Sequence, residues 1–291
     1  MMWCQRTDLA AEARQLWQES AGKTSSLRGV KAREETRRGF SVTEVTILDR
    51  EGSEALGKPE GRYLTVDLRP YFADRSGKFS DAAEVVAKAL EDLLPQEGEV
   101  FVAGLGNRAM TPDAIGPLTV EHLLVTRHLS QVLPDFRPVS AAAAGVLGTT
   151  GLESAEWVEG LARRCGAGAV IAVDALAARE AERLCATVQL SDTGLVPGSG
   201  VGNHRKALNG ETLGVPVISV GVPTVVDAAT LAADLTGGNL PPQLEQKGRG
   251  LFVTPREVDA RVADLGRLLG TAITMALQPG LTAEDALALV Q

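Results

Sequence analysis

The sequence has few of the residues that bind metals or form disulfides. Its three cysteines, Cys4, Cys165 and Cys185, lie far apart in a chain of 291 residues and form no CxxC pair. This spacing encodes neither a disulfide framework nor a thiolate zinc site, and it fits a reducing compartment. His122 and His128 do not have the i, i+4 spacing of a helical zinc pair, and no glutamate follows His122.

Long apolar runs and an excess of positive charge are also missing. No stretch approaches the roughly 18 consecutive apolar residues of a membrane span, and the first residues lack the basic and apolar segments of a signal peptide. With 29 Lys and Arg against 37 Asp and Glu, the formal net charge is −8, so we expect no lasting complex with DNA. Hydrophobic residues make up 44% and charged residues 23%, as in soluble globular proteins.

Apolar runs alternate with helical patterns through the middle of the chain. The predicted strands cover 40–48, 61–68, 100–105, 169–173 and 215–220. The predicted helices cover 8–20, 81–94 (with a capping box at Asp81 and Glu84), 118–133, 176–184 and 226–235, and a loop over 236–250 precedes a last helix that opens at 254–257. Near-continuous apolar strands between helices predict one α/β domain with a mostly parallel central sheet and helices on both faces.

Acidic residues follow two of these strands, where catalytic groups collect in open α/β sheets. Asp174 comes directly after the apolar strand 169–173, and Asp113 follows the loop after strand 100–105. Burial would raise the pKa of each carboxyl. If the two acids meet, they could share a proton and activate a water, or they could hold a divalent cation. The alternative is that each aspartate caps the helix that follows it.

Glycine is dense between 191 and 203, where it would let backbone amides approach a ligand closely. We predict a substrate-binding loop here, formed by Asp192, Gly194, Gly198, Gly200 and Gly202. No Gly-Lys-Ser/Thr follows, so the segment is not a Walker loop, and a surface loop is the alternative. The next residues, His204-Arg205-Lys206, are expected to form an exposed basic patch. No Gly-x-Ser-x-Gly motif is present, so a serine hydrolase is not indicated.

Motifs along nearly the whole chain resemble the germination protease family of endospore-forming bacteria. They lie at Arg6–Ala10, Glu60–Thr65, Gly104–Asn107, Thr111–Ala114, Leu123–Leu129, Arg137–Ser140, Ile171–Arg179, Ser191–Asn203, Gly221–Ala228 and Val253–Pro255. The resemblance implies an endopeptidase that cuts small acid-soluble spore proteins during germination in the spore core, with Asp113 and Asp174 as the catalytic pair. It also implies a homotetramer, and we expect no cofactor, no membrane and no direct nucleic-acid partner.

The family is similar in fold to hydrogenase maturation proteases, whose equivalent carboxylates engage a metal. That likeness keeps a metal-dependent endopeptidase open, with a divalent cation held by the same two acids. A second alternative is a non-catalytic protein whose glycine-rich loops bind a ligand, although the missing Walker lysine counts against a nucleotide.

The segment Thr7-Asp8-Leu9-Ala10 is similar to the sites that this family cuts in its substrates. The resemblance therefore implies a zymogen that cuts itself between Asp8 and Leu9, with residues 1–8 as a propeptide and 9–291 as a single peptidase domain. The alternative is that Asp8 caps the first helix, with Glu12 one turn later. Since acid would weaken that cap, we expect processing to be favoured in mild acid.

Overall fold

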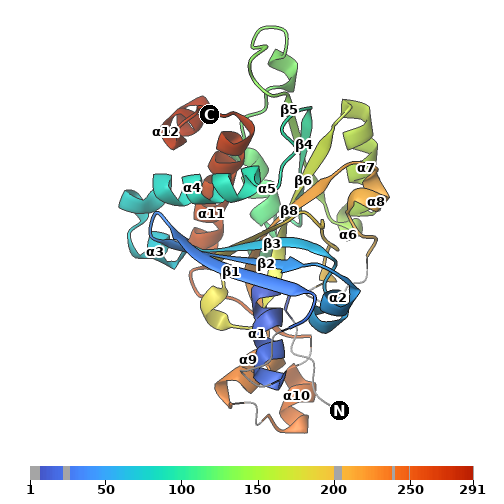
Figure 1. The fold of residues 1–291 in the computed structure, drawn as a ribbon, viewed down its shortest axis with the longest axis vertical. Helices are drawn as coiled ribbons and strands as arrows, with labels where there is room; N and C mark the ends of the chain where they lie inside the picture. Colours follow the sequence, from blue (N-terminus) through green and yellow to red (C-terminus); the bar gives the residue numbers. More distant parts are fainter. Residues whose placement is uncertain (1–6, 22–26, 200–204, 238–239, 249, 291) are drawn as a thin grey trace.

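The computed structural model describes residues 7–21, 27–199, 205–237, 240–248 and 250–290, and a large sheet runs through its centre (Figure 1). Within these residues the sheet has nine strands. They are β1 (Val30–Arg37), β2 (Phe40–Ile47), β3 (Gly61–Asp67), β4 (Val100–Leu105), β5 (Val139–Gly145), β6 (Ala169–Ala178), β7 (Thr187–Ser191), β8 (Val217–Asp227) and β9 (Phe252–Val253).

The strand order is β1-β2-β3-β7-β8-β6-β4-β5, with β9 paired to β8. Strands β8, β6, β4 and β5 are parallel to one another, whereas β1, β2, β3 and β7 continue the sheet as antiparallel strands. The predicted parallel arrangement thus holds for one half of the sheet, and an antiparallel half extends it.

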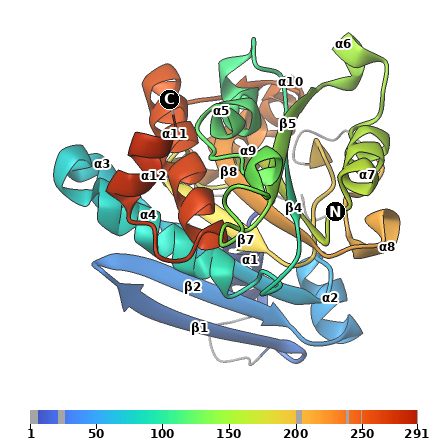
Figure 2. The same cartoon turned by 90° about the horizontal axis from the view of Figure 1, so that it is seen from above.

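Helices cover both faces of the sheet, which confirms the predicted α/β class (Figure 2). One face carries α4 (Arg75–Glu91), α5 (Ile115–Glu121), α11 (Val258–Leu277) and α12 (Ala283–Leu289). The opposite face carries α1 (Ala10–Ala21), α2 (Arg50–Leu56), α7 (Ser154–Cys165) and α8 (Gly210–Leu213). The short helices α3 (Arg69–Ala73), α6 (Leu147–Thr150), α9 (Ala228–Leu235) and α10 (Pro242–Gly248) complete the described part of the fold.

Alternation along the central strands explains how both faces are covered. In β4, Val100 and Val102 belong to the main core beneath α4 and α11, whereas Phe101 and Ala103 pack on the other side with Val158 of α7. A strand that is apolar at every position can therefore support helices on both faces.

The predicted helix over 118–133 is wrong in extent. Helix α5 ends at Glu121, and only a short 3₁₀ turn follows at Arg127–Leu129. Tertiary hydrogen bonds draw the chain out of the helix: Leu124 N donates to Thr274 Oγ1 at 3.1 Å, and Thr126 N donates to the Val139 carbonyl at 3.0 Å.

The predicted helix over 176–184 is also wrong. Its first residues extend β6, because Ala177 and Ala178 pair with Val225 and Val226 of β8, and only a 3₁₀ turn follows at Ala181–Arg183. Alanine favours a helix in isolation, but here the backbone N–H and C=O groups form hydrogen bonds with the long neighbouring strand β8.

The starts of two helices and the content of one loop also differ from the sequence prediction. Helix α4 begins at Arg75 with Asp74 as its N-cap, so Asp81 lies inside the helix and opens no capping box. The predicted loop over 236–250 contains α10. Helix α11 begins only at Val258, and the Thr254 hydroxyl donates to the Thr224 carbonyl at 2.8 Å and does not cap a helix. No described helix is long and apolar enough to cross a membrane.

Candidate active site

Asp174 lies in β6 and is 6% exposed. One of its oxygens accepts a hydrogen bond from the neighbouring Ala175 N at 2.9 Å. Burial and, next in size, the negative charge of Asp113 raise the pKa of Asp174 to about 8. The carboxyl therefore holds its proton at neutral pH. Because Asp174 belongs to a strand, the alternative that it caps a helix is wrong.

Asp113 ends the 3₁₀ turn Thr111–Asp113 that follows β4, and its Oδ2 accepts from Asn107 N at 2.7 Å. Burial raises the pKa of Asp113, while the Asn107 N–H and the positive charge of Arg205 oppose the rise. Helix α5 begins after Ala114 without a side-chain cap, so the capping alternative is wrong for Asp113 as well.

A close helix–strand approach brings the two aspartates to one place. Gly116, in the first turn of α5, lies against the ends of β4 and β6. A Cβ at Gly116 would stand 2.3 Å from the Leu105 carbonyl oxygen and 2.5 Å from that of Val173. Only glycine permits this contact. It holds the turn that carries Asp113 beside the point where β6 reaches Asp174.

Both aspartates line a cleft of about 1570 Å³. The strand registers place Asp174, Gly221 of β8 and Gln189 of β7 side by side across the sheet, so their side-chain positions share one face. This is the face that α1, α2, α7 and α8 cover (Figure 2). The site is thus a buried protonated acid beside a second carboxyl, in a cleft large enough for an extended peptide.

The predicted glycine-rich loop borders this cleft in part. Gly194 and Gly198 line it, but Asp192 does not; its Oδ1 accepts from Arg62 N of β3 at 2.8 Å. Gly194 has φ +72°, and a Cβ there would stand 2.0 Å from the Leu208 carbonyl oxygen. The local turn therefore requires glycine at position 194. Gly200 and Gly202 lie outside the described residues.

The N-terminal segment also enters the cleft. Asp8 N donates to the Ala177 carbonyl at 2.9 Å, and the Asp8 carboxylate accepts from Ala177 N at 2.8 Å and from Ser199 Oγ at 3.0 Å. Asp8 therefore pairs with β6 and does not cap α1, so the capping alternative is wrong. Helix α1 starts at Ala10, whose N–H donates to Gln189 Oε1 at 2.7 Å.

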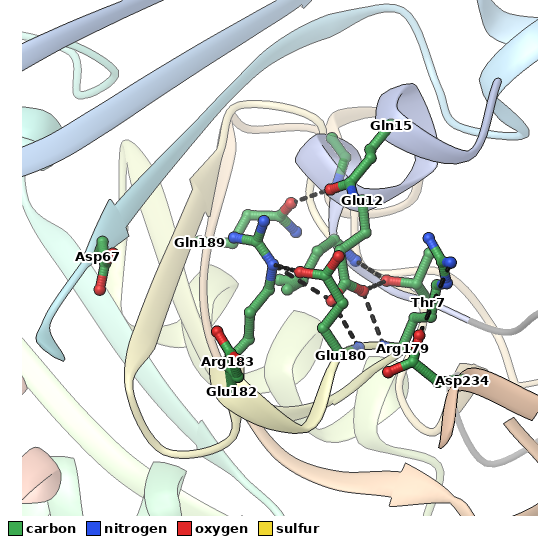
Figure 3. A network of polar contacts seen from close by, with 12 residues as sticks. Thr7, Glu12, Gln15, Asp67, Arg179, Glu180, Glu182, Arg183, Gln189 and Asp234 are labelled. Atoms are coloured by element: carbon green, nitrogen blue, oxygen red, sulfur yellow. Dashed lines mark hydrogen bonds and ion pairs between the residues drawn. The ribbon is translucent and has the colours of Figure 1, made fainter. Parts of the chain in front are cut away.

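A buried carboxylate anchors this segment to the end of β6. Figure 3 shows Glu12 reaching from α1 toward the residues that follow that strand. Glu12 is 0% exposed and accepts from Arg179 N at 2.8 Å, Glu180 N at 3.0 Å and the Thr7 hydroxyl, and it pairs with Arg183 at 3.3 Å. Burial raises the pKa of Glu12, and these partners oppose the rise.

Two basic residues of the cleft were not predicted from the sequence. Arg205 lies within electrostatic range of both Asp113 and Asp174, so the expectation of an exposed basic patch is wrong for this residue. Lys58 also lines the cleft, where burial lowers its pKa and the charges of Asp8 and Glu12 oppose that effect. No sequence signal marks either residue, because both reach the site from segments remote from the aspartates.

The described residues contain no group of three His, Cys, Asp or Glu side chains placed to hold a metal ion. Asp113 and Asp174 thus have no third described carboxylate, imidazole or thiolate beside them, so a cation held by this pair would take water or substrate oxygens as its remaining ligands.

Known proteins resemble this chain over most of its length. The germination protease family model matches residues 10–237. The chain belongs to the germination protease family. It is 41% identical to the germination protease of Clostridium perfringens strain ATCC 13124, over 98% of both chains. It is 40% identical to that of Caldanaerobacter subterraneus subsp. tengcongensis over 96% of both, and 46% identical to that of Bacillus cereus strain G9842 over 79% of this chain and 65% of the relative.

Membership of the germination protease family confirms that the chain is an endopeptidase, and it argues against the non-catalytic binding protein. One solved structure that matches is the NiFe hydrogenase maturation protease HycI from Thermococcus kodakarensis. That match has a TM-score of 0.35 and 18% identity, and it covers 64% of this chain and 98% of the other.

Proposed function

We propose that Asp113 and Asp174 cut the peptide bond as a pair that shares one proton, and that the substrates are small acid-soluble spore proteins degraded in the spore core during germination. The observation that carries the proposal is the raised pKa of Asp174, about 8, beside a second carboxyl in the cleft. A protonated acid next to an ionised one can supply and remove protons at neutral pH.

In the proposed reaction, ionised Asp113 takes a proton from a water that attacks the peptide carbonyl carbon. Asp174 gives its proton to the carbonyl oxygen, which yields a gem-diol intermediate. The intermediate then collapses: the proton on Asp113 moves to the peptide nitrogen, the C–N bond breaks, and a hydroxyl proton returns to Asp174. Arg205 contributes a positive charge near both acids and favours the ionised form of Asp113.

The experiment is degradation of a purified small acid-soluble spore protein by the full chain and by two variants. Asp113→Asn and Asp174→Asn should each lower kcat by about 10³-fold or more while the circular dichroism spectrum is kept. Asp135→Asn, at an exposed aspartate outside the cleft, should behave as wild type. Full activity in Asp174→Asn would refute the pair.

The proposed reaction uses no cofactor, and a chelator distinguishes it from the metal-dependent alternative. Activity that persists in excess EDTA supports the aspartate pair. Loss of activity that added Mn²⁺ or Zn²⁺ restores would instead support a metal held by the same carboxylates.

We also propose that the full-length chain is a zymogen, in which residues 1–8 form the propeptide and 9–291 the peptidase domain. The position of Asp8 in the cleft supports this division, since the segment occupies space that a substrate needs. A homotetramer is proposed as well. Exposed apolar side chains at Val132, Leu147 and Leu152, on either side of β5 in the chain, support an association surface. Light scattering after gel filtration tests the tetramer.

A further inference from the structure

The cleft contains a binding site for a carboxylate that is distinct from the aspartate pair. In the full-length chain Asp8 occupies it: Oδ2 accepts from Ala177 N at 2.8 Å and Oδ1 accepts from Ser199 Oγ at 3.0 Å. Lys58 adds a positive charge that interacts with Asp8, and its Nζ donates to the Thr7 carbonyl at 3.4 Å. A backbone N–H, a hydroxyl and an ammonium together suit an acidic side chain.

The backbone of the same segment is held as a bound peptide would be. Strand β4 pairs with β6 only as far as Val173, and Asp8 N donates to the Ala177 carbonyl further along β6 at 2.9 Å. Across the cleft, Gln189 clamps the segment: its Nε2 donates to the Asp8 carbonyl at 3.0 Å, and its Oε1 accepts from Ala10 N at 2.7 Å. Pairing with a strand edge is a common way to bind extended peptides.

The carboxylate site is close to the candidate catalytic groups. Ala177 is three residues beyond Asp174 on β6, which corresponds to about 10 Å along a strand. The Asp8 carbonyl is held by Gln189, and the strand register places Gln189 on the same face as Asp174 with only Gly221 between them. The negative charge of Asp8 also raises the pKa of Asp174, so the two carboxyls lie within electrostatic range of each other.

We propose that Lys58, Ser199 and the Ala177 N–H form the subsite that binds an acidic side chain of the substrate next to the bond to be cut. The proposal rests on the proposed peptidase function of the cleft. In the full-length chain Asp8 fills the subsite, and removal of residues 1–8 leaves its donors without their acceptor. A neutral side chain would leave Lys58 and the two hydrogen-bond donors unsatisfied, and such a site rejects analogues that lack the group it binds.

The test uses a chain that begins at Leu9, released from a cleavable amino-terminal fusion so that it does not depend on self-processing. Two fluorogenic peptides carry Thr-Asp-Leu-Ala, as at residues 7–10, or the matched Thr-Asn-Leu-Ala. We expect kcat/KM to favour the Asp peptide by about tenfold or more. Lys58→Met should remove most of this preference by lowering kcat/KM for the Asp peptide, and Ser199→Ala should remove part of it. The control Lys31→Met, at an exposed position on β1, should leave the preference unchanged.

Binding is measured separately, by fluorescence anisotropy of both peptides on the Leu9-start chain carrying Asp174→Asn. Tighter binding of the Asp peptide that Lys58→Met abolishes supports the subsite even if the wild type cuts neither peptide, a result that would refute only the proposed catalysis. Equal affinity for the two peptides would overturn the proposed subsite. So would a Lys58→Met variant that loses the same affinity for both peptides.

Discussion

Asp174 links the stability of the protein to its proposed chemistry, because burial and the charge of Asp113 raise the pKa of this carboxyl to about 8. Activity of the pair requires Asp174 protonated and Asp113 ionised. We therefore expect a bell-shaped dependence of kcat/KM on pH, with the alkaline limb near pH 8. The raised pKa of Asp113 places the acid limb above its ordinary value of 3.8. Rates of peptide cleavage across the pH range test this, and a rate that stays constant well above pH 8 would contradict it.

The same raised pKa predicts the effect of Asp174 on stability. The folded chain keeps a proton on Asp174 that the unfolded chain releases, so the stabilising contribution is complete below about pH 4 and is lost as pH rises to about 8. Asp174→Asn has no such proton to lose. At pH 8 its free energy of unfolding in urea should exceed that of wild type by on the order of 2 kcal/mol. The difference should shrink toward pH 4. A difference that does not change with pH would show that Asp174 is not buried as a protonated acid.

Gly194 is a structural requirement of the loop that borders the cleft. Its φ of +72° and the 2.0 Å approach of a Cβ to the Leu208 carbonyl oxygen both disfavour any other residue. Gly194→Ala should lower the free energy of unfolding by about 1–3 kcal/mol and lower activity in parallel. The control is Gly160→Ala in α7, where a Cβ meets nothing within 4 Å and should be neutral or slightly stabilising. Unchanged stability in Gly194→Ala with reduced activity would instead assign this glycine to substrate contact.

At the scale of elements, α1 depends on one buried carboxylate for its attachment to the sheet. Glu12 accepts from Arg179 N and Glu180 N and pairs with Arg183, so it joins α1 to the end of β6 (Figure 3). Glu12→Gln places an amide NH₂ against these donors and removes the negative charge. We expect the free energy of unfolding, measured in urea, to fall by about 2–4 kcal/mol.

The matched control for this prediction is Glu60→Gln, at an exposed position before β3, which should change stability little. If Glu12→Gln proves as stable as the control, the contacts of Glu12 in Figure 3 contribute no net stability, and α1 is held mainly by apolar packing and by the hydrogen bond from Ala10 to Gln189. That packing comes from Ala10, Ala13 and Trp17 against Val45, Ile47 and Tyr63.

At the scale of the whole molecule, the segment that begins the chain and the aspartate pair meet in one cleft, so the protein should process itself. Incubation of the full-length chain at about pH 5 to 6, the mild acid in which we expect processing, should yield a product that starts at Leu9, directly after the carboxylate that Ser199 and Ala177 hold. Sequencing of the new amino terminus identifies the cut. The product should be absent from Asp174→Asn, and an active enzyme that retains Met1 would refute self-processing.

Much of this molecule could be predicted from local patterns in the sequence. Apolar runs identified the central strands, and their length and spacing identified an α/β sheet with helices on both faces. Asp113 and Asp174 could be singled out because each follows such a run, and chain direction alone puts the carboxyl ends of parallel strands at one edge. Motifs spread over the chain identified the germination protease family, which the comparisons confirm.

Contacts between distant segments decided the rest. The local pattern of alanines after Asp174 predicts a helix, but these residues pair with β8 and form a strand. The antiparallel half of the sheet depends on β3 and β7, which lie far apart in the sequence. Lys58 and Arg205 lie just outside the motifs and far in the chain from the aspartates, and their charges act in the cleft because burial weakens the screening by water. The sequence alone therefore determined which acids lie at the strand ends, and only the tertiary structure determined their protonation and which donors face them, since both depend on burial and on neighbours remote in the chain.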